Sequence, residues 1–247
     1  MSSLRAAYIN EIYKLSKRKK LMVSCVLSVA AVLVAALIVG VANNFMGIRI
    51  TGESEFSILV LSVLNYTLIP LFTIFICIDM VGGEFSNQTM KMVLTRPVSR
   101  IKVYLSKAMA AATFIIVNLL FIMVTSLIIS LFIKGTLAGI GRIFIAYVAS
   151  FFPLFVFALF TMIISTVFRG TGSAFFLSIL CFLLCNVLGL FFSQLQSFLF
   201  TTAFNWYTLF LGSYINFHKI FRMFMILAGL GLMFFGIGSY LFDRKNL

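Results

Sequence analysis

Hydrophobic residues in this chain gather into long runs that are apolar on every side, and short polar segments separate these runs. A helix that crosses a membrane needs about 20 apolar residues, which span about 30 Å. The runs show no strict alternation of apolar and polar residues, which a strand of a membrane barrel would require. The pattern predicts an all-α polytopic membrane protein, residues 1–247 forming a single domain. The six predicted spans are 21–41, 56–81, 104–132, 143–168, 173–192 and 223–242.

The segment 1–20, before the first span, has a different pattern. Its apolar residues recur at helical spacing, and its charged residues fall at other positions. This favours an amphipathic helix that lies in the inner interface with its cations toward anionic headgroups. A plain basic flank that only fixes the topology is the alternative. The apolar positions are Leu4, Tyr8, Ile12 and Leu15, and the charged ones are Glu11, Lys14, Lys17 and Arg18.

The segment 193–222, between the last two spans, is unusually aromatic for a loop. It includes Phe204, Trp206 and Tyr207 and carries almost no charge before His218. Aromatic rings with a polar end suit the headgroup level of a membrane. We expect short re-entrant helices on the outer side, buried against protein where the backbone turns. A merely interfacial loop is the alternative.

Composition agrees with a membrane protein, since 62% of residues are hydrophobic and 10% are charged. The net charge of +13 is explained by the position of the cations. If the N-terminus is inside, 14 of the 19 Lys and Arg residues fall on the cytoplasmic side. This bias predicts that both termini are cytoplasmic, and it indicates lipid rather than nucleic acid as the partner of these cations. The outer cations are Arg49, Lys134, Arg142, Lys219 and Arg222.

The sequence offers little for bond chemistry. It has no phosphate-binding loop, only one histidine, and four cysteines that all lie inside apolar runs, so neither a catalytic site nor a metal site is expected. The acids Glu11, Glu53, Glu55, Asp79, Glu84 and Asp243 sit at or outside the ends of spans. Asn65, Asn118 and Asn186 lie within spans, where they either bond across helices or line a substrate path.

The segment 82–103 interrupts the apolar pattern with Gly-Gly, charged residues and a proline. We expect a short helix from Glu84 or Ser86 to about Thr95, ended by Pro97. An amphipathic helix displayed in the cytoplasm could fit a groove on a partner, while a helix on the membrane surface is the alternative. The expected contact face is Phe85, Thr89, Met92 and Val93.

These residues resemble a family. Gly83–Lys91 (GEFSNQTMK), then Leu94, Arg96–Arg100 (RPVSR) and Lys107, are similar to the signature of ABC-2 type permeases. The N-terminal Glu11, Lys14, Leu15 and Arg18 resemble the elbow-helix pattern of that family. This chain departs from the signature at Asn87-Gln88, because many members have a glycine at the second of these two positions.

The resemblance implies the transmembrane subunit of a bacterial exporter with the type V ABC fold. Its partners would be two copies of a P-loop ATPase, which carries ATP and magnesium, and a second permease copy or homologue. No cofactor would be bound by this chain. Phe204, Trp206 and Tyr207 would form an outer gate. The residues implied in ATPase coupling are Glu84, Phe85, Thr89, Lys91, Met92, Val93, Arg96, Arg100 and, between spans four and five, Arg169.

The composition favours one class of cargo. The 30 phenylalanines and the lack of a charge near the membrane centre favour a hydrophobic or amphipathic peptide, such as a toxin, an antimicrobial peptide or a bacteriocin. Export of lipid-linked, drug or ion cargo by the same family is an alternative. A membrane anchor or sensor without transport is the alternative from another class.

Overall fold

The computed structural model describes residues 3–17, 19–45, 55–86, 99–134, 139–168, 170–191, 201–212 and 216–245. Within these ranges every regular element is a helix, and six helices are long and apolar enough to cross a membrane. The protein is therefore an all-helical, multi-pass membrane protein. The elements are α1 (Ser3–Lys17), α2 (Lys19–Phe45), α3 (Glu55–Tyr66), α4 (Leu68–Ser86), α6 (Arg100–Lys134), α7 (Ile140–Val167), α8 (Thr171–Phe191), the 3₁₀ helix η2 (Thr202–Phe210) and α9 (Phe217–Arg244).

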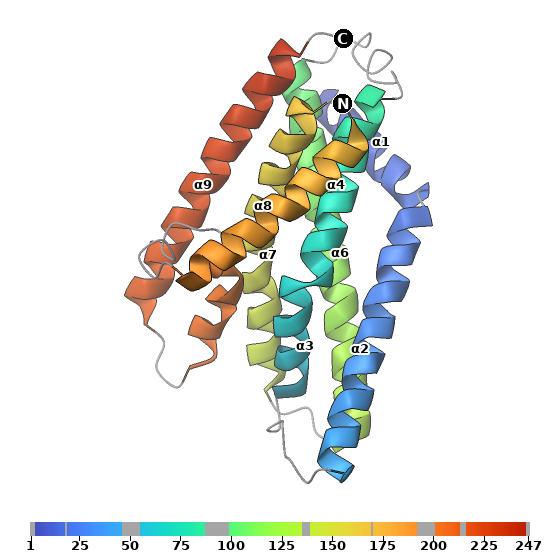
Figure 1. Cartoon of the computed structure of the whole chain (residues 1–247), viewed down its shortest axis with the longest axis vertical. Helices are drawn as coiled ribbons and strands as arrows, with labels where there is room; N and C mark the ends of the chain where they lie inside the picture. Colours follow the sequence, from blue (N-terminus) through green and yellow to red (C-terminus); the bar gives the residue numbers. More distant parts are fainter. Residues whose placement is uncertain are drawn as a thin grey trace.

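The helices differ in how deeply they are buried. Helix α7 is central and packs against α4, α6, α8, α9 and η2. Helices α4 and α7 are mostly buried, whereas most of the surface of α2, α8 and α9 is exposed. Figure 1 shows α2 and α9 on opposite sides of the bundle. The exposed helices are apolar, as expected for surfaces that face lipid or a second membrane subunit.

The predicted second span is not one continuous helix. The helix is interrupted at Thr67, whose backbone N–H bonds to the carbonyl of Leu64 instead of continuing the α-helical pattern. Pro70 explains the break, because a proline has no N–H and its ring would clash with the carbonyl of Tyr66 in a continuous helix. Only the part after the break, Leu68–Ser86, is long enough to cross a membrane.

Glu84 and Ser86, where a separate helix was expected to begin, belong to α4, and the rest of that expected helix lies outside the described residues. Helix α4 continues through Gly82 and Gly83 and ends at Ser86, so these residues form its last turn. Gly82 permits close packing there, because a Cβ atom at this position would lie 2.8 Å from Ser165 Oγ of α7. Buried ion pairs of Glu84, described below, stabilise the same turn.

Helix α9 carries two glycine pairs that differ in environment. A Cβ at Gly238 would overlap the hydroxyl of Tyr104 on α6, and a Cβ at Gly231 would touch Val156 of α7 at 3.6 Å. No atom of the described residues lies within 4 Å of a Cβ built at Gly229 or Gly236. One pair therefore packs within the chain, and the other leaves an open stripe on the outer side of α9.

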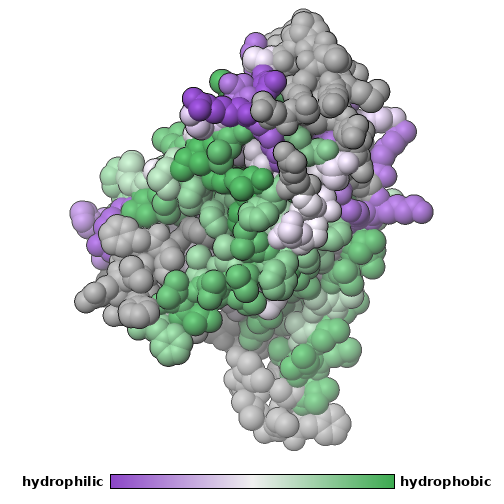
Figure 2. All heavy atoms as spheres, turned by 45° about the horizontal axis from the view of Figure 1, so that its top comes forward, coloured by the Kyte–Doolittle hydropathy of each residue, from purple (hydrophilic) through white to green (hydrophobic). Residues whose placement is uncertain are grey.

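Both termini lie at the same end of the bundle (Figure 1). The last turn of α4, the start of α6 and the connection from α7 to α8 lie at this end too. Figure 2 shows hydrophobic residues across the middle of one face, with hydrophilic residues gathered toward this end. We call it the terminal end of the bundle and the other one the distal end.

Candidate functional site

A closed set of ion pairs is buried at the terminal end, where α1, α4 and α6 meet. The Nζ atom of Lys107 lies 3.1 Å from Glu11 Oε2 and 2.7 Å from Glu84 Oε2. The Nζ atom of Lys14 lies 3.0 Å from Glu11 Oε1 and 2.8 Å from Glu84 Oε1. Each lysine thus bridges both carboxylates, and each carboxylate oxygen accepts from a lysine. We call Glu11, Lys14, Glu84 and Lys107 the charge ring.

The ions of the charge ring are buried, so each of them needs hydrogen-bond partners within the protein. Lys107 is fully buried, and Glu11 and Glu84 are 4% and 5% exposed. A buried ion stays charged only if its hydrogen-bonding groups are satisfied. The third N–H of Lys107 donates to the Met80 carbonyl at 2.8 Å, so all three of its donors have partners. Two positive and two negative groups also leave the ring itself without net charge.

Lys14 is the most exposed member of the ring. Burial alone would lower the pKa of Lys14, but the hydrogen bonds and charges of Glu84 and Glu11 outweigh it and raise the pKa above its usual 10.5. Lys14 is therefore positively charged throughout the physiological pH range.

The ring corrects the expected role of two residues. Glu11 was expected on the polar face of an interfacial helix, yet it is buried because Lys107, 96 positions away, reaches it from α6. Glu84 was expected on a surface that contacts a partner, yet it is buried because both lysines surround it. Lys17 on α1 is exposed, in agreement with the predicted polar face.

Next to the ring, Phe85 joins α4 to the last turn of α9. Its ring meets that of Phe242 edge to face at 5.7 Å, and the Nζ atom of Lys245 lies 4.1 Å from its centroid. Phe85, expected on a face that contacts a partner, is half-buried by these contacts within the chain. Arg100, at the start of α6, donates to the carbonyl of Asp243 at the end of α9.

The other predicted coupling residues lie outside the described part of the chain. These are Thr89, Lys91, Met92, Val93, Arg96 and Arg169. The structure does place the ends of the segment that contains most of them. Helix α4 ends at Ser86, two residues after Glu84 of the charge ring, and α6 begins at Arg100, seven residues before Lys107.

Two of the three membrane asparagines bond across elements, as expected for helix packing. Asn65 Nδ2 donates to the Phe204 carbonyl at 2.7 Å, which joins α3 to η2. Asn118 Oδ1 accepts from Ser28 Oγ at 3.2 Å, which joins α6 to α2. Asn186 instead donates to the Phe182 carbonyl of its own helix at 2.8 Å.

Replacement of Asn65 by Ala should lower the free energy of unfolding by about 1–2 kcal/mol, because the buried Phe204 carbonyl loses its donor. Asn186→Ala is the matched control, since its bond lies within one helix, and it should change stability by less than about 0.5 kcal/mol. Equal losses in a detergent unfolding titration would contradict the role of Asn65 in holding η2.

The three residues expected at an outer gate are all buried. Phe204, Trp206 and Tyr207 are at most 5% exposed, and all belong to η2 at the distal end. Phe204 packs on Phe157 of α7 and on Phe182 of α8, with ring centroids 6.0 Å away in both cases. These contacts hold η2 against the bundle, which explains why a nearly uncharged aromatic segment is found here.

Sequence reasoning did not anticipate the charge ring. Glu11 and Lys14 were noted on the N-terminal segment, Glu84 after the second span and Lys107 near the start of the third, but nothing predicted that they would meet. The available signal was the charge itself, since four charged residues near span ends can be buried together only as balanced pairs. Their sequence separations of 70 and 96 residues hid the pairing.

The sequence matches one protein family, described as "Protein of unknown function (DUF2705)", over residues 29–247. No curated protein matches the chain. The matched range contains Glu84 and Lys107 of the charge ring, and it also contains η2. It covers every crossing helix completely except α2, whose first residues precede it.

Proposed function

The chain belongs to the DUF2705 family, and we propose that it is the permease subunit of an ATP-driven exporter. The observation that carries this proposal is the charge ring. The resemblance to ABC-2 type permeases rested on separate stretches of sequence, which include Glu11, Lys14, Glu84 and Lys107. These four side chains are in contact with one another.

The position of the ring fits the work of such a subunit. Residues 87–98 connect α4 to α6. Helix α4 ends two residues after the ring member Glu84, and α6 contains the ring member Lys107. A partner that moves this segment acts on α4 and α6 together. Glu11 of α1 binds Lys107 of α6, and Lys14 of α1 binds Glu84 of α4. Because of these bonds, α1 moves with both helices and the terminal end responds as one unit.

In the proposed topology, six helices cross the plasma membrane and the terminal end lies in the cytoplasm. The excess of Lys and Arg at this end supports that orientation. Helix α1 would then lie near the inner interface as an elbow helix. Residues 193–222 would be outside, where η2 would close the exit of the path.

The proposed complex contains two copies of a P-loop ATPase, which bind ATP and magnesium, and a second permease copy or homologue. The open stripe of Gly229 and Gly236 on α9 supports close approach of another membrane helix. The cargo is proposed to be a hydrophobic or amphipathic peptide, such as a toxin or antimicrobial peptide. The apolar lining of the pocket between α6 and α7 favours such a cargo over a free ion.

Co-purification tests the proposal directly. The tagged chain, extracted from its own host, should bring down a P-loop ATPase. Arg96→Glu should reduce the recovered ATPase about tenfold or more, because like charges placed in an interface cost several kcal/mol. Lys17→Glu is the matched control, since this exposed cation lies on α1 at the same end, and it should leave recovery unchanged.

Three outcomes separate the alternatives. Recovery of no ATPase by the unaltered chain would overturn the proposal. Equal recovery of the ATPase with both variants would show that the 87–98 segment does not contribute to the interface. An ATPase that co-purifies but hydrolyses ATP at the same rate with and without candidate peptides in liposomes would favour a non-transporting anchor.

A further inference from the structure

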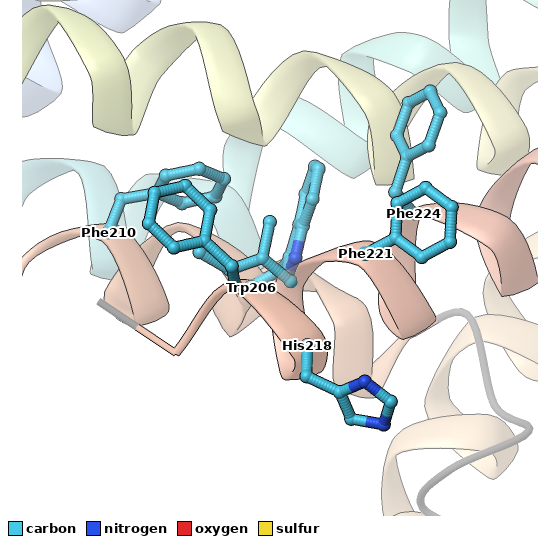
Figure 3. A pocket seen from close by; sticks show the side chains of 7 residues that line it. Trp206, Phe210, His218, Phe221 and Phe224 are labelled. Carbon is cyan, nitrogen blue, oxygen red and sulfur yellow. The ribbon is translucent and has the colours of Figure 1, made fainter. Parts of the chain in front are cut away.

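An aromatic pocket lies at the distal end, between η2 and the start of α9. It has a volume of about 570 Å³, and its walls include Trp206, Phe210, Phe221 and Phe224. Figure 3 shows these rings around the pocket, with the imidazole of His218 at its edge and pointing away from them. Phe217 and Phe221 on the rim are 77% and 60% exposed, so the pocket opens sideways from the bundle, where lipid would surround it.

One polar atom inside this pocket lacks a partner. The indole nitrogen of Trp206 is buried and has no hydrogen-bond acceptor among the described residues, although the residue is only 5% exposed. In Figure 3 this nitrogen lies on the side of the pocket nearer His218. A buried donor without an acceptor is costly, and a ligand that brings an acceptor removes this cost. The acceptor must accompany an apolar body, because the walls are aromatic.

The pocket continues into a longer apolar groove. Phe224 lines both the pocket and a groove of about 520 Å³ between α6, α7 and α9, which reaches Leu159 and Phe235. From Phe224 to Phe235 the helix rises by about 16 Å, close to half of the roughly 30 Å hydrocarbon core. The groove therefore has the length of the acyl region of one leaflet.

Cations of α9 lie beside the pocket. Arg222 follows His218, which lines the edge of the pocket, by one turn on the same side of the helix. Lys219 and the N-terminus of α9 add further positive potential. The acids whose side chains are described, Glu11, Asp79, Glu84 and Asp243, belong to the terminal end instead.

We propose that this pocket binds one anionic phospholipid. An acyl chain lies in the groove along α9, an ester carbonyl accepts from Trp206 Nε1, and the headgroup phosphate lies at the edge of the pocket near Lys219 and Arg222. A lipid is favoured over a peptide because the groove opens to the membrane and holds no polar group that could pair with a peptide backbone among its lining residues. This site goes beyond the proposed export function and does not require an ATPase partner.

Fluorescence can test the site because Trp206 is the only tryptophan in the chain. The purified full chain is reconstituted into dioleoylphosphatidylcholine vesicles with increasing fractions of phosphatidylglycerol that carries brominated acyl chains. Bromine quenches tryptophan on contact. Brominated phosphatidylglycerol should reach half of its maximum quenching at about a fivefold lower fraction than brominated phosphatidylcholine, since one cation near a headgroup contributes on this scale.

A pair of matched variants tests whether Arg222 causes the preference for phosphatidylglycerol. Arg222→Gln should remove most of the preference for phosphatidylglycerol, whereas Arg142→Gln, an exposed arginine at the same end on α7, should retain it. Equal quenching by both lipids in the unaltered chain would overturn the anionic site. Absence of quenching by either lipid would mean that a peptide or protein segment covers Trp206, and would also overturn it. Loss of preference in both variants would show only general surface charge and contradict the assigned site.

Discussion

Replacement of Lys107 by Met is expected to destabilise the protein by about 3–5 kcal/mol, the cost of breaking a buried ion pair by removing one partner. The side chain is fully buried and bonds to Glu11, Glu84 and the Met80 carbonyl. Without its ammonium group, the ring keeps two carboxylates and one lysine, so an unbalanced negative charge stays buried. Reversible unfolding in mixed detergent micelles, followed by circular dichroism, measures the loss.

A second substitution tests whether the charge balance itself matters. Glu84→Gln removes one negative charge, so Lys107→Met combined with Glu84→Gln restores neutrality in the ring. The double variant should be more stable than the sum of the single losses predicts, with a coupling energy of about 1–3 kcal/mol. Lys19→Met, an exposed lysine at the start of α2, is the control and should change stability by less than about 0.5 kcal/mol. Strictly additive losses would contradict a coupled ring.

Gly238→Ala is expected to cost about 1–3 kcal/mol, as overpacking of a filled core does. The new Cβ would overlap the Tyr104 hydroxyl and lie 2.7 Å from its Cζ atom. Tyr104 has little room to move, because it is fully buried and packs on Phe235 and Phe242 with centroids 5.5 and 5.6 Å away. The expected result is a lower free energy of unfolding with the helix content unchanged.

Gly236→Ala is the matched control for this substitution. It lies two residues earlier on the same helix, but no described atom lies within 4 Å of the added Cβ. Alanine has the better helix propensity by about 1 kcal/mol, so this variant should be neutral or slightly more stable. If Gly236→Ala is instead the damaging change in a reconstituted complex, the open stripe is covered by another subunit.

The sequence predicted the crossing helices well because hydrophobic length is a local property. The first and third spans, for example, extend only a few residues beyond the predicted 21–41 and 104–132. The second span was predicted less well. Pro70 gave a local reason for a break, but prolines are tolerated in membrane helices when neighbours satisfy the backbone, so its effect depends on packing.

The charge ring could not be predicted in the same way because its partners are far apart in sequence. A lysine such as Lys107, near the end of an apolar run, has the same sequence pattern whether it marks the membrane boundary or is buried in an ion pair. Glu11 on an amphipathic segment is equally ambiguous. Only the packing of α1 against α6 distinguishes the two cases. The pairing of Asn65 with a backbone carbonyl 139 residues away was hidden for the same reason.

The break at Thr67 has a mechanical consequence. An unbroken rod through the membrane would transmit every tilt of one end to the other, whereas two shorter rods joined at Thr67 need not move together. Helix α3 is tied to η2 through Asn65, and α4 is tied to α1 and α6 through Glu84. At the junction, the Thr67 N–H bonds to the Leu64 carbonyl and the Thr67 hydroxyl bonds to the Val63 carbonyl. The predicted second span is thus divided into two helices, α3 and α4, which are held by different ends of the molecule.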